Sequence, residues 1–148
     1  MTNVTLAQAS IIVDTAIAKG RELNLAPLTV VVLDPGGHMV AMKREDKSGI
    51  LRADIASGKA WGTLGMGFGG REFAHRAAGG GGLFLTALMA ASDGRVVPAP
   101  GGVLIRDNAG DIVGAVGISG DTSDKDEICA VAGIAAAGLK ADTGDPAA

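Results

Sequence analysis

The chain has 148 residues, of which 47% are hydrophobic and 20% charged, and its net charge is −3. This is the size and composition of a globular domain with its own core, so we expect one domain over residues 1–148. The 3% aromatic content and the lack of a basic stripe exclude a nucleic-acid partner. No run of residues approaches the ~18 apolar residues of a membrane span, which excludes a membrane partner. No secretory signal is recognisable, so we expect a cytoplasmic protein.

The first predicted element is a helix that begins after Thr5. Thr5 and Gln8 match the T-x-x-Q capping box, in which each side chain binds a free backbone N–H. Apolar residues then recur at helical spacing, which predicts one buried stripe: Leu6, Ala9, Val13, Ala16 and Ile17. Gly20 or the segment 25–27 should end the helix.

A β-hairpin follows. The β-branched run 28–33 predicts a strand buried on both faces. The Asp-Pro-Gly-Gly sequence of 34–37 is typical of a turn, and residues 38–43 return as a second strand.

The middle of the chain is rich in glycine. We predict a helix from an N-cap at Ser48 to about Trp61, with these apolar positions: Ile50, Leu51, Ile55, Ala56 and Ala60. Glycines at 65–70 should break it, and 71–78 should form short helical turns. Residues 79–82 must be a loop, and 83–91 should form a short helix or a buried connection.

The last third predicts more sheet and a final helix. A sheet portion should begin at 96–97, followed by strands at 103–106 and 112–118 with a turn between them. Ser123 or Asp124 should cap the last helix, whose predicted buried stripe is Ile128, Val131, Ala132, Ala135 and Leu139. Residues 141–148 should form a frayed tail. The hairpins require antiparallel pairing, so the expected fold is α+β: one antiparallel sheet of about five strands covered by helices.

Several polar residues are candidates for chemistry. Lys59 lies among small residues, so it is either a ligand for a carboxylate or a solvated lysine. Arg71 and His75 are four residues apart and would share a helix face, either to clamp an acidic ligand or as an exposed charged face. His75 is alternatively an axial haem ligand or a proton carrier. His38 opens a strand, and Glu127 is either part of a helix cap or a general base.

Other motifs are weaker. Residues 65–70 match G-x-G-x-x-G, but a predicted helix precedes them instead of the strand that dinucleotide binding requires. They are either a flexible loop or a backbone that approaches a ligand. Cys129, the only cysteine, lies in an apolar helical stripe and is interpreted as a core residue. The two histidines form no recognisable metal motif, so we predict no metal.

Five segments in order give the chain a recognisable pattern: Val31–His38, Ala56–Ala60, Pro100–Ile105, Val113–Gly120 and Asp126–Gly133. With these segments it resembles the GlcG/HbpS-like family, also called the haem-degrading domain. The resemblance implies a five-stranded antiparallel sheet flanked by helices, as in profilin- or PAS-like sandwiches. It also implies a homo-oligomer, built from dimers and up to an octamer. Some members bind haem or corrinoid, and others accompany enzymes of small organic acids. This chain departs from the family between Thr63 and Ser92, where its own ligand preference should lie.

Three functions follow from this pattern. In the first, the protein binds a small organic acid and catalyses proton transfer. Lys59 and Arg71 would hold the carboxylate, Glu127 or His75 would move the proton, and Gly101 and Gly102 would present N–H groups to an oxyanion. In the second, it binds haem for sensing or storage, with His75, His38 and the methionines as available ligands. In the third, it is a non-catalytic accessory or assembly domain.

Overall fold

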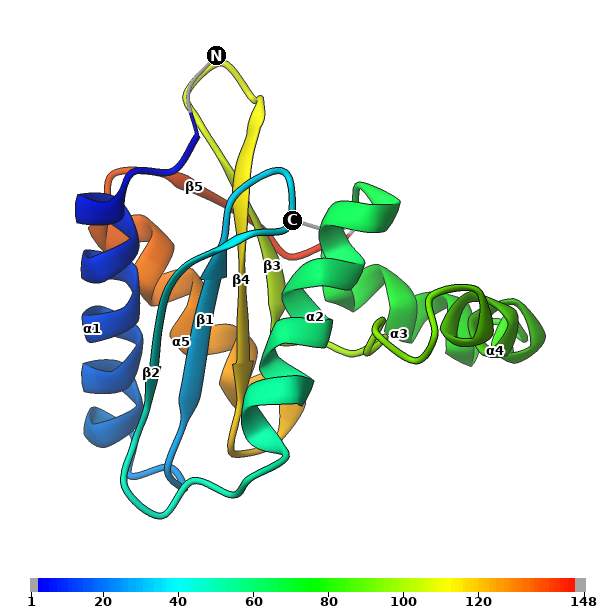
Figure 1. The fold of residues 1–148 in the computed structure, drawn as a ribbon, viewed down its shortest axis with the longest axis horizontal. Coiled ribbons are helices and arrows are strands. Elements are labelled where there is room, and N and C mark those ends of the chain that lie inside the picture. The colour runs from blue at the N-terminus through cyan, green and yellow to red at the C-terminus, as the bar shows by residue number, and fades with distance from the viewer. Residues whose placement is uncertain (1–2, 146–148) are drawn as a thin grey trace.

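The computed structural model describes residues 3–145, which form a helix–sheet–helix sandwich (Figure 1). In chain order the elements are α1 (Leu6–Glu22), β1 (Thr29–Leu33), β2 (Met39–Arg44), α2 (Arg52–Met66), α3 (Gly70–Ala78), α4 (Gly82–Ala91), β3 (Gly102–Arg106), β4 (Ile112–Ser119), α5 (Ser123–Ala136) and β5 (Lys140–Asp142). The strand order is β2-β1-β4-β3-β5, and every neighbouring pair is antiparallel. The predicted fold class is therefore confirmed.

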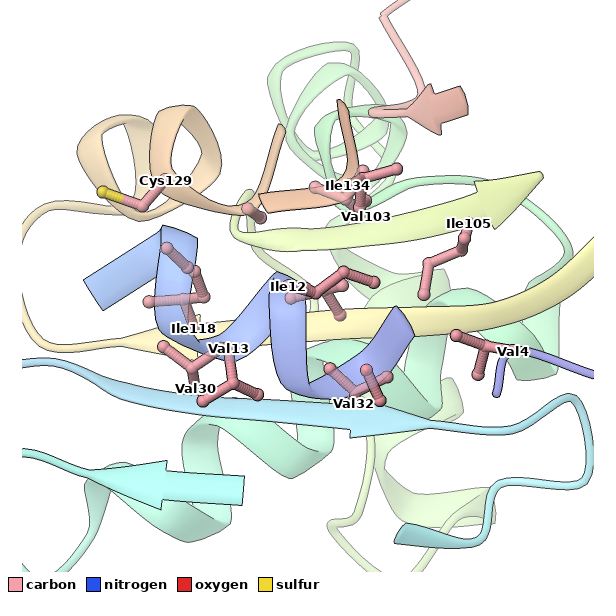
Figure 2. Packing of buried hydrophobic residues seen from close by; sticks show 14 of the residues in the cluster. Val4, Ile12, Val13, Val30, Val32, Val103, Ile105, Ile118, Cys129 and Ile134 are labelled. Carbon is pink, nitrogen blue, oxygen red and sulfur yellow. The ribbon is translucent and has the colours of Figure 1, made fainter. Parts of the chain in front are cut away.

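The two faces of the sheet carry different helices. Val30 and Val32 of β1 point to one face, where α1 and α5 cover them, and Figure 2 shows Ile12 and Val13 of α1 packed there. Val31 and Leu33 point to the other face, which α2 covers. The alternation of strand side chains explains why all five residues of β1 are buried. The predicted strand with two buried faces is confirmed.

The first helix has the predicted start. Thr5 and Gln8 form both hydrogen bonds of the capping box, at 3.1 and 3.0 Å. The predicted stripe is wrong at Leu6, which is 65% exposed, whereas Ile12 is fully buried. The helix also continues past Gly20 to Glu22.

The predicted start of the second helix is wrong. The Ser48 hydroxyl does not cap it but is bonded to the Thr29 hydroxyl at 2.8 Å, and α2 begins only at Arg52. Ile50 and Leu51, two of the apolar positions assigned to this helix, precede it and are exposed. The helix runs through Gly65 to Met66 and ends at Gly67, whose left-handed φ of 77° suits glycine. The G-x-G-x-x-G match thus begins in the last turn of α2 and has no strand before it.

Two predictions about the sheet are wrong. Residues 96–97 form no strand: Val96 packs against Phe73 and Leu85 beside the sandwich. The fifth strand is instead β5, in the segment predicted to be a frayed tail. It pairs antiparallel with β3, and Arg106 of β3 also forms an ion pair with Asp142, whose nitrogen and oxygen are 2.8 Å apart.

The last helix presents a different face from the one predicted. Thr122 is its N-cap, and the buried residues are Asp126, Cys129, Ala130, Gly133 and Ile134. The pattern missed this face because it contains a carboxylate and a glycine, while Ile128 is 46% exposed. Cys129 is fully buried, which confirms its interpretation as a core residue (Figure 2).

Candidate functional site

Lys59 and Asp126 form an ion pair in the interior. Lys59 comes from α2 and Asp126 from α5, and their side chains are 4% and 0% exposed. The Lys59 ammonium donates to Asp126 at 3.2 Å and to the Ile118 carbonyl at 2.9 Å. The Asp121 backbone N–H donates to the second carboxylate oxygen at 3.0 Å. Lys59 is thus neither solvated nor in a cleft, and its carboxylate partner is a residue of its own chain.

Burial moves both groups of this pair toward their neutral forms. Desolvation lowers the pKa of Lys59 below its ordinary value, although the nearby carboxylate of Asp126 opposes the change. Desolvation likewise raises the pKa of Asp126, against the effect of the Lys59 charge. The mutual attraction and the hydrogen bonds hold the two groups in contact.

Gly101 and Gly102 lie directly against Lys59. Gly101 has φ +102°, and a Cβ built there would stand 2.9 Å from the Lys59 ammonium. A Cβ on Gly102 would collide with the Lys59 carbonyl. Both glycines are buried, so here they permit close packing between β3, the turn before it and α2.

Arg71 and Glu127 form a second, separate pair. Arg71 at the start of α3 donates two hydrogen bonds to Glu127, from Nη2 at 2.8 Å and from Nε at 3.2 Å. It also contacts Asp124 at 2.8 Å. The bond to Glu127 raises the pKa of Arg71 above its ordinary value, against the opposing effect of desolvation. The Arg71 guanidinium, predicted to hold the carboxylate of a ligand, is here bound by two carboxylates of α5.

The histidines lie apart from both pairs. His75 is exposed on α3. His38 is exposed in the β1–β2 turn, and its Nδ1 lies 3.2 Å from Asp34. The sequence-predicted site residues therefore form two paired clusters and two exposed histidines, not one site. Within residues 3–145, no group of three or more His, Cys, Asp or Glu side chains could hold a metal ion.

A cleft of about 460 Å³ lies elsewhere, between α2, the β1–β2 turn and the loop after α4. On α2 its residues are three or four positions apart and share one face of the helix. We call it the Trp61 cleft, and it is lined by Leu33, Gly37, Met39, Asp54, Ser57, Gly58, Trp61, Asp93, Gly94 and Arg95.

Two glycines let the walls of the Trp61 cleft approach each other. A Cβ on Gly58 would stand 2.5 Å from the Arg95 carbonyl, so only glycine lets this loop lie against α2. Gly37 has φ +83°, and a Cβ there would meet the Trp61 ring at 3.0 Å. The Gly-Gly turn and the A-S-G-K segment thus shape this cleft.

The charged side chains of the cleft have no ion-pair partner within residues 3–145. The side chains of Asp54 and Asp93 make neither a hydrogen bond nor an ion pair there. The Arg95 guanidinium makes one contact, 4.0 Å from the centroid of the Trp61 ring. Sequence reasoning missed these residues because they belong to three separate segments. The one available signal was Trp61, the only tryptophan of the chain.

The described part of the chain contains no helix that is long and apolar enough to cross a membrane. The residues predicted to set ligand preference, 63–92, do not line the Trp61 cleft, although the loop that follows α4 does.

Comparisons with known proteins agree with the fold. Over 127 residues the chain is 32% identical to an uncharacterised 15.0 kDa protein of Citrobacter freundii from the dhaT-dhaS intergenic region, covering 86% of this chain and 87% of that one. The crystal structure of a PduOC–haem complex has a TM-score of 0.83 at 23% identity, covering 97% of this chain and all of the other. The Klebsiella pneumoniae protein ORFY has a TM-score of 0.82 at 26% identity, covering 93% and 92%.

The family model described as "Haem degrading protein HbpS-like" matches residues 4–135, which is most of the chain and includes all five segments that carry the resemblance. The chain therefore belongs to the HbpS-like family.

Proposed function

We propose that this protein binds a small organic molecule in the Trp61 cleft. Its volume of about 460 Å³ is within the usual range of ligand pockets, roughly 300–1,000 Å³. The observation that carries the proposal is the lining itself: an apolar wall beside three charged side chains that have no ion-pair partner in the described chain. All three side chains are exposed to solvent, so they are open to contact with a ligand.

The lining favours a hydroxy acid with a flat or apolar part. Arg95 could donate to a carboxylate, and Asp54 and Asp93 could accept hydrogen bonds from hydroxyl groups. Trp61 and Met39 would contact the apolar part. In this proposal the ligand carboxylate is bound by Arg95, and not by Lys59 and Arg71 as the sequence suggested.

Haem is a second candidate for the same cleft. Met39 lines the cleft and is 54% exposed, and the preceding residue His38 is exposed but outside the lining, so two side chains of the axial-ligand type follow each other in the chain there. The family description and the PduOC–haem complex support haem as a ligand class. His75 lies on α3, outside this lining.

Binding has more support than proton transfer. Catalysis by Lys59 would require a ligand to reach a pair that is 4% and 0% exposed, and Glu127 is held by Arg71. His75 is exposed on α3, and no residue of α3 lines the cleft. A proton-transfer activity would therefore have to use Asp54 or Asp93, the acids of the cleft.

Trp61 offers a direct test, because it is the only tryptophan and the chain has no tyrosine. We expect its fluorescence to change saturably when a panel of hydroxy and keto acids is titrated. Haemin forms a separate arm, in which specific binding should add a Soret shift that Met39→Leu or His38→Ala alters. Arg95→Ala should weaken binding of an acid by about 10- to 100-fold, because it removes a charge-assisted hydrogen bond.

Arg44→Ala is the matched control, since Arg44 is exposed on β2 and outside the cleft. It should leave the binding curve unchanged. The proposal would be wrong if neither the acids nor haemin changed Trp61 fluorescence, or if Arg95→Ala and Arg44→Ala had equal effects.

A further inference from the structure

The loop between β2 and α2 exposes two large apolar side chains. Ile50 and Leu51 are 87% and 65% exposed, and they follow each other immediately before α2. In Figure 1 this loop, residues 45–51, crosses from the end of β2 to the start of α2. Apolar residues scattered singly over a surface are normal, but adjacent ones form a patch of the kind that binds ligands or partners.

The two residues form part of a groove of about 350 Å³. We call it the Arg52 groove, and it is lined by Gly49, Ile50, Leu51, Arg52 and Ile55. It shares no lining residue with the Trp61 cleft. Arg52 and Ile55 are three positions apart on one flank of α2, whereas Asp54 of the cleft lies between them in sequence and faces another side of the helix. The Arg52 groove is therefore a separate site.

The loop that carries the Arg52 groove is held in place by hydrogen bonds. The Leu28 backbone N–H donates to the Glu45 carboxylate at 2.8 Å, and the Glu45 N–H donates to the Leu28 carbonyl at 2.9 Å. The Ser48 N–H donates to the Glu45 carbonyl at 3.1 Å, and the Ser48 hydroxyl is bonded to Thr29. The exposed apolar residues thus project from a fixed backbone, so a ligand that binds them loses little free energy in ordering the loop.

Arg52 brings a positive charge to the groove that no carboxylate of residues 3–145 neutralises. Its Nη1 donates to the hydroxyl of the fully buried Ser119 at 3.0 Å, and this is its one hydrogen bond within that range. In the described part of the chain no buried side-chain nitrogen lacks a partner, so the unpaired Nε and Nη2 of Arg52 reach solvent. These two nitrogens form the fork that can donate to both oxygens of one carboxylate.

The local structure does not account for the charge of Arg52. It is the first residue of α2, where the positive end of the helix dipole disfavours a cation. Asp121, the acidic residue closest to Ser119 in sequence, is held by two backbone N–H groups and not by Arg52. Residues 47–53 contain two cations and no acid, although the whole chain has a net charge of −3. This segment is therefore suited to an anion.

We propose that the Arg52 groove binds an aliphatic carboxylate, with the Arg52 fork on the carboxylate and the alkyl chain along the three aliphatic residues of the groove. An inorganic anion would leave these aliphatic residues in water, and a neutral hydrocarbon would leave Arg52 unpaired. Only a ligand with both parts uses the whole lining. A free aliphatic acid and the C-terminal leucine of a peptide share this chemistry.

Methyl NMR of the full chain tests the site with monomeric octanoate as the probe. We expect saturable shifts of the Ile50, Leu51 and Ile55 methyl groups, while those of Leu33 and Met39, which line the Trp61 cleft, stay in place. Octanol has the same chain without the charge and should bind at least about tenfold more weakly, because it forms no charge-assisted hydrogen bond. Acetyl-leucine and acetyl-leucinamide make the same comparison for a peptide C-terminus.

Two variants separate the charge from the apolar contact. Arg52→Met should weaken octanoate binding by about 10- to 100-fold, because it removes the charge-assisted hydrogen bonds. Arg44→Met is the matched control and should bind like the wild type, since Arg44 is exposed and lines neither site. Leu51→Ala, at a position that is 65% exposed, should weaken binding about fivefold without touching the bond from Arg52 to Ser119. Circular dichroism should show that all three variants remain folded.

Several results would overturn the proposal. These are no methyl shift in the groove, equal binding of octanoate and octanol, and equal effects of Arg52→Met and Arg44→Met. Shifts confined to Leu33 and Met39 would place the acid in the Trp61 cleft, which would support the proposed function and overturn this inference. Broadening of the groove methyl signals with protein concentration, without octanoate, would assign the groove to a second copy of the chain instead.

Discussion

Lys59 joins two helices that cover opposite faces of the sheet. It extends from α2 to the end of β4, where Ile118 accepts one hydrogen bond, and to Asp126 of α5. Removing two charges from water costs free energy, so such a pair is weak evidence for a gain in stability. Its hydrogen bonds do specify how α2 and α5 are placed relative to β4. We therefore interpret Lys59 as a residue that holds the layers in position.

Removing one member of this pair should be costly. Lys59→Met leaves the Asp126 carboxylate buried without its counter-charge, and we expect the free energy of unfolding at pH 7 to fall by about 3–5 kcal/mol. Without Lys59, the already raised pKa of Asp126 rises further, so the folded state favours the protonated acid. The stability that this raised pKa contributes is fully present below the ordinary pKa of 3.8. It is lost as the pH rises through the pKa of Asp126 in the folded variant. The deficit of the variant should therefore shrink as the pH is lowered from 7 to 5, as measured by urea unfolding.

Lys43→Met is the natural comparison, because Lys43 forms an ion pair with Asp14 at 2.8 Å while both side chains are about 60% exposed. Exposed pairs contribute little, so this change should cost less than about 1 kcal/mol. Equal losses for the two variants, or a Lys59→Met deficit that does not change with pH, would contradict the interpretation of a buried pair.

At the scale of elements, glycine sets how closely α2 can lie on the sheet. A Cβ on Gly117 of β4 would overlap the Ala56 carbonyl of α2. Gly117→Ala should therefore force α2 away from β4 and reduce the free energy of unfolding by about 1–3 kcal/mol. Gly65 lies on the same helix, but a Cβ there would meet nothing within 4 Å. Gly65→Ala should stabilise the protein by up to about 1 kcal/mol, through helix propensity alone.

Guanidinium unfolding of the two variants measures this difference in stability. Both are Gly→Ala changes, but only the site at Gly65 has room for a Cβ. Destabilisation by Gly65→Ala, or tolerance of Gly117→Ala, would show that close packing of α2 on β4 is not what these glycines provide.

The elements also show what the sequence could predict. α1 and β1 were predictable because their signals are local: a capping box in one and a β-branched run in the other. β5 was not, because its residues Lys140–Asp142 have no strand propensity and are held by pairing with β3. The start of α2 was misplaced because the Ser48 hydroxyl has a partner in β1, 19 positions away.

In the candidate site, too, local patterns could be predicted from the sequence but contacts between distant residues could not. Lys59, Arg71 and Glu127 were singled out as residues that bind a ligand or move a proton, and in the structure each is paired with a residue of the chain itself. Choosing between an intrachain carboxylate and a ligand carboxylate requires knowing that the first turns of α5 reach Lys59 of α2 and Arg71 of α3. The Trp61 cleft combines three segments between Leu33 and Arg95, so no local pattern announces it.

At the scale of the whole molecule, the sandwich and α4 differ in how they are held. β1 and β4 lie inside the sheet with helices on both faces, whereas only Leu85 of α4 is buried. Elements with few buried apolar residues open locally at a lower free energy than the core does. Asp93 and Arg95 follow α4 directly, so the loop that closes the Trp61 cleft is attached to this weakly held helix. Any contact that fixes α4 would also steady that wall of the cleft.

Hydrogen exchange can measure this difference between α1 and α4. We expect the α4 amides to exchange roughly a hundredfold faster than those of α1, because α1 buries Ala9, Ile12, Val13 and Ala16 whereas α4 buries only Leu85. If the α4 amides were as protected as those of α1, the contacts of Leu85 and Leu88 with Phe73 and Val96 would be enough to hold the helix as firmly as the sandwich core holds α1.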